Sequence, residues 1–352
     1  MLFRVFDKEL LPALFYVLAV NRLVGPVKKG MDGNGRPLYA FDWLYDFADL
    51  ALDYDSTAFS AKKFFLPYQE TMATFSAVDR KDWRKEVDFN AYWPIVFFGM
   101  HPCDINALNK LDKVLIKSGY PNPYYAAKRK NCFIIGMECS PQPYCFCRSM
   151  GTHTATHGFD MFLTDIGESY FVVIQSAHAY EFLKNIETRE PSTEDHSLYL
   201  QTMEKKNAGF TCQVDTTDLT KILDLKFESD SWRMWGERCL SCGTCANVCP
   251  TCYCYGVEEH IDLSLRGATK SRFLYSCNLI DFAEVAGGHN FRPDSHTRLK
   301  YRYYHKHRGF VEIYEEPLCV GCGRCGQACL ADITVPDVIN SIRQEGRGHE
   351  SS

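Results

Sequence analysis

Seventeen cysteines among 352 residues give this chain its most informative chemistry, and eight of them form two runs with the same spacing. Each run has the pattern Cys-x2-Cys-x2-Cys-x3-Cys, and the members are Cys239, Cys242, Cys245 and Cys249, repeated eighty positions later as Cys319, Cys322, Cys325 and Cys329. Two-residue gaps let one tight loop carry three thiolates to three corners of a small iron–sulfur cube. Glycines inside both runs allow the backbone to approach such a cube closely.

The fourth cysteine of each run decides how two such sites would be shared. In bacterial two-cluster ferredoxins the displaced cysteine ligates the other cluster. We therefore expect one [4Fe–4S] cluster on Cys239, Cys242, Cys245 and Cys329, and a second on Cys319, Cys322, Cys325 and Cys249. The alternative is structural zinc, but zinc ribbons use cysteine pairs and not a triplet with a displaced fourth cysteine. The segment between the runs, residues 250–318, is far longer than in simple ferredoxins.

A second group of cysteines lies in the N-terminal half, at Cys103, Cys139, Cys145 and Cys147. Residues 94–100 and 133–137 are apolar runs of strand length, and the spacing between them predicts a helix capped by Asp104. In a parallel sheet Cys103 and Cys139 would emerge at the same carboxyl edge, where ligands of α/β sheets collect. The four thiols either form a third metal site or are unrelated reduced cysteines, and their spacing alone leaves both interpretations open.

The remaining cysteines and a basic segment carry weaker signals. Cys252, Cys254 and Cys277 are free, support the clusters or bind a further metal, whereas Cys132 and Cys212 are expected to be structural. Residues 289–308 contain six Lys or Arg and one acidic residue, Asp294. This segment is either a solvated face, or a docking surface or source of charge beside anionic clusters.

Composition excludes several classes of function. A formal charge of −5, with 46% hydrophobic and 24% charged residues, fits a soluble globular protein without a nucleic-acid role. Clustered cysteines in odd number argue for metal rather than disulfides, and no apolar stretch reaches the length of a membrane span. We find no dinucleotide or ATP motif and no catalytic nucleophile or acid–base residue, so a catalytic role for this chain itself is not assigned and a cytoplasmic location is expected.

The fold class that the sequence predicts is α+β. We expect an N-terminal α/β domain over residues 1–225 and a C-terminal dicluster ferredoxin-like domain over 226–352. Residues 10–20 predict a helix, 161–164 and 170–175 a hairpin, and 178–226 mainly helix. Residues 81–88 are expected to form a solvated helix or loop.

Several longer strings together are specific to one group of proteins. They are Pro102–Leu108 (PCDINAL), Cys145–Thr152 (CFCRSMGT), Cys239–Cys254 (CLSCGTCANVCPTCYC), Ala286–Arg292 (AGGHNFR), Leu299–Lys306 (LKYRYYHK) and Cys319–Cys325 (CVGCGRC). In these strings the chain resembles the electron-transfer subunit of anaerobic sulfite reductase and the related beta subunits of soluble NAD(P)-linked nickel–iron hydrogenases, the sulfhydrogenases. The resemblance covers about 94–340. Leu330 departs from the family's proline after the last cysteine.

The resemblance implies a cytoplasmic electron-transfer subunit of a multi-subunit oxidoreductase. Its partners would be a flavin and [2Fe–2S] subunit that uses NAD(P)H and a catalytic subunit carrying sirohaem, the favoured interpretation, or nickel and iron. The family pattern includes Cys103, Cys139, Cys145 and Cys147 and so implies a third cluster. The competing hypotheses are a free-standing iron–sulfur reductase that uses this N-terminal site, and a zinc–cysteine interaction protein.

Overall fold

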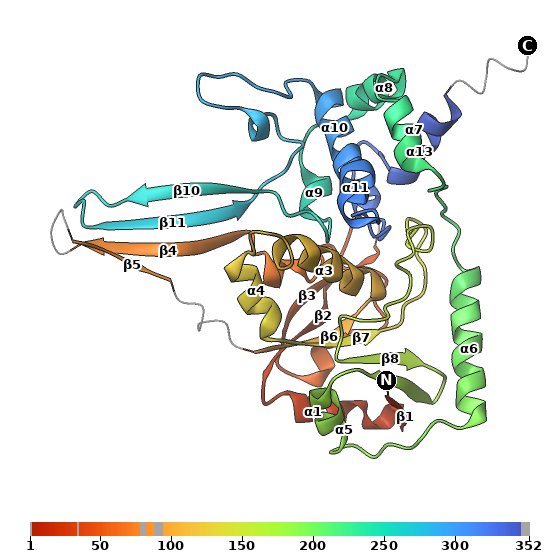
Figure 1. The fold of residues 1–352 in the computed structure, drawn as a ribbon. Coiled ribbons are helices and arrows are strands. Elements are labelled where there is room, and N and C mark those ends of the chain that lie inside the picture. The colour runs from red at the N-terminus through yellow and green to blue at the C-terminus, as the bar shows by residue number, and fades with distance from the viewer. Residues whose placement is uncertain (1, 34, 78–81, 88–93, 346–352) are drawn as a thin grey trace, which may run out of the picture.

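The computed structural model describes residues 2–33, 35–77, 82–87 and 94–345 (Figure 1). Within these residues the main sheet has seven strands in the order β1-β9-β8-β7-β6-β2-β3. Their bounds are β1 Leu2–Asp7, β2 Arg22–Met31, β3 Pro37–Leu44, β6 Ile95–Met100, β7 Cys132–Met137, β8 Met161–Asp165 and β9 Ser169–Ile174. The mixed α and β architecture is the one that the sequence predicts.

The centre of the sheet is parallel and carries the predicted strand–helix–strand unit. Strands β2, β6, β7 and β8 run parallel to one another, whereas β8 and β9 form the predicted antiparallel hairpin. Helix α3 (Pro102–Leu115) crosses from β6 towards β7, followed by α4 (Pro123–Lys130). His101 and not Asp104 is the N-cap, because Pro102 fits the first helical position. Asp104 therefore lies inside the first turn.

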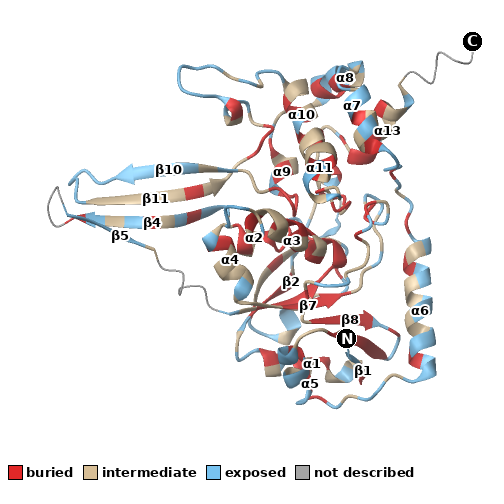
Figure 2. Ribbon diagram, viewed as in Figure 1, coloured by how far each residue is buried: buried red, intermediate tan, exposed pale blue. Residues whose placement is uncertain are grey.

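Helices cover both faces of this sheet. On one face α1 (Leu11–Leu18), the predicted N-terminal helix, and α5 (Ala177–Leu183) pack on apolar strand residues such as Ile135 and Leu163. On the other face the apolar stripe of α3 packs on Phe97 and Ile134, together with α2 (Lys62–Phe65) and α4. Figure 2 shows the buried residues concentrated in this layered core.

A second sheet projects from the body as an arm (Figure 1). Its four antiparallel strands are β10 (Tyr255–Ile261), β11 (Gly267–Leu274), β4 (Gln69–Ala77) and β5 (Trp83–Glu86), in that order. The prediction of helix or loop for 81–88 is wrong over β5, and residues 81 and 88 lie outside the described residues. Pairing of β4 with β11 joins the N-terminal half to the segment between the cysteine runs.

The C-terminal part is mainly helical. The helical prediction for 178–226 is confirmed by α5, α6 (Thr193–Ala208) and α7 (Leu219–Leu225). Further helices are α8 Asp230–Arg238, α9 Thr244–Asn247, α10 Ser295–Tyr304, α11 Phe310–Tyr314, α12 Arg324–Gln327 and α13 Val335–Gln344, with a wider turn at His305–Gly309 and 3-10 turns at Lys8–Leu10, Phe47–Asp49 and Ile280–Ala283. Trp232 and Trp235 are buried in a core that also contains Tyr303 and Ile339. No helix among the described residues combines the length and the apolar character that a membrane span requires.

Candidate metal centres

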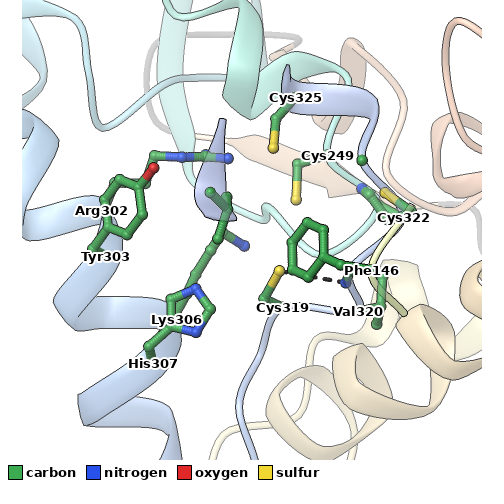
Figure 3. A pocket seen from close by; sticks show the side chains of 14 residues that line it. Phe146, Cys249, Arg302, Tyr303, Lys306, His307, Cys319, Val320, Cys322 and Cys325 are labelled. Atoms are coloured by element: carbon green, nitrogen blue, oxygen red, sulfur yellow. Dashed lines mark hydrogen bonds between the residues drawn. The ribbon is translucent and has the colours of Figure 1, made fainter. Parts of the chain in front are cut away.

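The second cysteine run lines a cavity together with one cysteine of the first run. The sulfur-bearing side chains around it are Cys249, Cys319, Cys322 and Cys325 (Figure 3). The ferredoxin pattern predicts this grouping, including the exchange of Cys249. The role of the four thiols as cluster ligands stays a prediction.

Both runs use the same loop conformation. Gly243 and Gly323 each have φ +77°, and each precedes a short helix, α9 or α12. In each loop a backbone N–H is turned to the first cysteine, since Ser241 donates to Cys239 Sγ at 3.4 Å and the equivalent Gly321 donates to Cys319 Sγ at 3.4 Å. N–H groups directed at sulfur stabilise thiolates that hold a cluster.

The rest of the first run lies at the edge of the C-terminal core. Cys239 and Cys329 both pack against this core, whose buried Trp232 and Trp235 precede the run. Asn278 Nδ2 donates to Cys245 Sγ at 3.4 Å, whereas Cys242 is exposed. This group is thus more open to solvent than the cavity of the second run.

The N-terminal cysteines also come together. Cys103 opens α3 directly after β6, and Cys139 follows the neighbouring parallel strand β7, as predicted. The sulfurs of Cys145 and Cys147 are 3.2 Å apart. The hydrogen bond with Cys147 lowers the pKa of Cys145, whereas burial raises the pKa of Cys139 to about 12. Burial, and then the charges of Asp104 and neighbouring thiols including Cys139, raise the pKa of Cys103 well above its ordinary value.

The N-terminal group adjoins the second run directly. Cys103 is in one apolar cluster with Val320, and Cys322 packs against that cluster. The Phe146 N–H donates to Gly321 O at 2.8 Å, and the Phe146 side chain lines the cavity of the second run. A Cβ atom on Gly321, whose φ is +64°, would lie 2.7 Å from Cys147 Cα. Only glycine fits this close approach of the two loops.

Two buried ion pairs lie at this junction. Both guanidinium Nη atoms of Arg324 donate to the carboxylate of Asp104, at 2.8 and 2.7 Å, and both residues are 2% exposed. Arg324 also donates to Thr57 O at 3.0 Å. Beside Cys139, the buried ammonium of Lys206 pairs with Glu138. No local signal in the sequence predicts these pairs, because their members are 220 and 68 positions apart.

The remaining cysteines lie around the same region or away from it. Cys252 is buried in one cluster with Cys249 and lies 3.7 Å from Arg302 Nη1. Cys254 lies close to Cys277, and hydrogen bonding with Cys277 lowers the pKa of Cys254. Cys132 begins β7 at the end opposite to Cys139, where its thiol donates to Arg129 O at 3.0 Å, and Cys212 packs beside the C-terminal core.

The donor set suits iron–sulfur clusters. Each of the three groups offers four thiols with no carboxylate or imidazole among the predicted ligands. Burial lowers the pKa of His307, which lines the cavity of the second run, to about 3 and keeps its ring neutral. No three His, Cys, Asp or Glu side chains of the described residues are arranged as they would be around a single metal ion.

Comparison with known proteins supports this chemistry. The family described as a 4Fe-4S dicluster domain matches residues 238–333. The chain is 37% identical over 345 residues to sulfhydrogenase 2 subunit beta of Pyrococcus furiosus, covering 96% of this chain and 97% of that protein. No solved structure gives a significant match.

Proposed function

This chain belongs to the sulfhydrogenase beta-subunit family, and on that premise we propose that it relays single electrons between partner subunits through three [4Fe–4S] clusters. The match to a 4Fe-4S dicluster domain supports iron–sulfur electron transfer in a hydrogenase-type complex. Bound clusters would supply the one-electron carriers. The chain itself would hold the clusters, exclude water from them and set their order.

We assign the ligands as three sets of four thiolates. The first site is Cys239, Cys242, Cys245 and Cys329; the second site is Cys249, Cys319, Cys322 and Cys325; the third site is Cys103, Cys139, Cys145 and Cys147. The observation that carries the proposal is the cavity of the second site, in which Cys249 from the first run joins three thiols of the second run.

We infer a linear relay with the second site in the middle. On one side Cys322 packs with Cys103 of the third site. On the other side Arg302 lines the cavity of the second site and also lies near the first site, where its positive charge lowers the pKa of Cys245 against the larger effect of burial. Close neighbours of this kind favour electron passage from the third site through the second to the first, or in the reverse direction.

The partners that we propose are a flavin and [2Fe–2S] subunit that uses NAD(P)H and a nickel–iron catalytic subunit. The 37% identity to a sulfhydrogenase subunit supports nickel and iron in that catalytic subunit. The strings shared with anaerobic sulfite reductase make a sirohaem subunit the second candidate. We place the complex in the cytoplasm, where thiols stay reduced.

Iron and acid-labile sulfide analysis with EPR of the dithionite-reduced protein, purified without oxygen, tests the relay. We expect about twelve iron atoms per chain and three cubane signals. Cys322→Ser should remove the second signal and about four iron atoms, and Cys139→Ser should remove the third. Zinc without sulfide contradicts the proposal, and an unchanged iron count in Cys139→Ser contradicts the third site. Co-purification of nickel–iron or sirohaem subunits separates the two partner candidates, and turnover by the isolated chain would instead support a free-standing reductase.

A further inference from the structure

Three buried cations surround the second site without a carboxylate partner. Lys62 is 4% exposed, Arg302 5% and Lys306 4%. In the described part of the chain none of the three forms an ion pair with Asp or Glu. Burying an ammonium or guanidinium without a counter-charge costs several kcal/mol per ion. The fold therefore implies an anion at this place.

The contacts of the three cations converge on the cysteines of the second site. Arg302 and Lys306 line the same cavity as Cys249, Cys319, Cys322 and Cys325, and Figure 3 shows both side chains reaching from the α10 side towards the sulfurs. Lys306 Nζ donates to Thr251 Oγ1 at 2.9 Å, and Lys62 Nζ donates to Cys252 O at 2.8 Å. Each of these hydrogen bonds goes to a neutral group, so the positive charge stays uncompensated.

The ionisation of Lys306 agrees with this geometry. Burial by itself lowers the pKa of Lys306, but the thiolates of Cys249 and Cys252 outweigh burial and hold the pKa above its ordinary value. An ammonium that is this strongly held beside thiolates remains positive throughout the neutral range. The charge is therefore present whenever the second site is in use.

The third site has a different balance of charge. Its two buried cations, Arg324 and Lys206, are each paired with a carboxylate, Asp104 and Glu138. Their net contribution is close to zero, whereas the cations at the second site contribute three positive charges. Four thiolates and a [4Fe–4S]2+ core carry two negative charges, and one-electron reduction raises this to three.

From this contrast we propose that Lys62, Arg302 and Lys306 form a buried cationic cage that raises the reduction potential of the second site above that of the third site. Positive charge in a low-dielectric interior stabilises the extra negative charge of the reduced state. The electron comes from the neighbouring site, whose reduced cluster is oxidised as the second cluster is reduced, and it leaves when the first site accepts it. No proton or further reactant is needed. The cage makes the middle of the relay its electron sink.

This inference rests on the proposed function, and midpoint potentials measured by EPR-monitored redox titration of the anaerobic full-length chain test it. The signal of the second site is identified as the one that Cys322→Ser removes. In Lys306→Met we expect that signal to need a potential at least ~59 mV lower, which is a tenfold change in the ratio of reduced to oxidised site for one electron. Lys306→Arg keeps the charge and should restore the midpoint.

The control variant is Lys300→Met, because Lys300 lies on the same helix, α10, but donates to Phe227 O and faces Glu228. It should leave all midpoints unchanged. Arg302 is near Cys245 of the first site as well as Cys249 and Cys325 of the second, so Arg302→Met should lower two midpoints. An unchanged midpoint in Lys306→Met with full iron content overturns the proposal.

Where Lys306→Met loses its cluster, Lys62→Met carries the test, since Lys62 reaches Cys252 O from α2 and is outside the lining of the cavity. The same downward direction is expected, and an unchanged midpoint overturns the proposal. Loss of the cluster from both methionine variants overturns it as well, because the lysines would then be required for assembly of the site. A wild-type chain without iron and sulfide refutes the proposed function itself, which distinguishes the two failures.

Discussion

The second and third cysteine sites adjoin each other but are built on opposite principles. The second site lies on two ferredoxin-like loops whose ligand spacing is local, and its buried cations have no carboxylate partners among the described residues. The third site is assembled at the carboxyl edge of a parallel sheet from residues up to 44 positions apart, and its buried cations are paired. The contrast indicates that cysteine spacing defines where a cluster binds, whereas the surrounding charge defines how easily it is reduced.

The largest effect is expected at the ion pair that joins the two sites. Arg324→Met leaves the Asp104 carboxylate buried without its guanidinium partner, which costs about 3–5 kcal/mol in buried pairs. Denaturant unfolding of the anaerobic protein should show this loss of free energy of unfolding. The double variant Arg324→Met/Asp104→Asn should recover much of it, and equal losses in the single and double variants would contradict the role of charge.

A smaller loss is expected where the two loops touch. Gly321→Ala places a Cβ 2.7 Å from the Cys147 backbone at a φ of +64°, so both sites must shift. Left-handed backbone strain alone costs about 1–3 kcal/mol. Iron analysis should show loss from the second and third sites together. Gly119→Ala is the matched control, because its Cβ meets open space at an ordinary φ, and equal iron content in both variants would contradict the close packing.

The subtlest change converts the charge of the third site towards that of the second. Glu138→Gln removes the carboxylate that neutralises Lys206 beside Cys139. The unpaired ammonium should then raise the midpoint potential of the third site by up to ~59 mV, tenfold in the reduced-to-oxidised ratio. EPR-monitored titration measures this shift, with the first site as internal control. A midpoint that falls in Glu138→Gln would reverse the comparison.

Some features of this fold could be predicted because their signals are local. The strand at 94–100, the following helix and the strand at 133–137 carry their periods in short segments, and the structure has β6, α3 and β7 there. The predicted cap of α3 at Asp104 is wrong, because Pro102 at the first helical position is the stronger signal. Strand β5 was missed, since its polar sequence Trp83–Glu86 is exposed and gains its conformation from pairing with β4.

Spacing along short stretches of chain was enough to predict the cysteine chemistry, the repeat of two loops and the meeting of Cys103 with Cys139 at one sheet edge. The charges around each site became visible only in the folded chain. Lys62 reaches Cys252 across 190 positions and Arg324 reaches Asp104 across 220. Such long-range electrostatic contacts leave no periodic or motif-like trace in the sequence, since Coulomb interactions depend on distance in space and on burial.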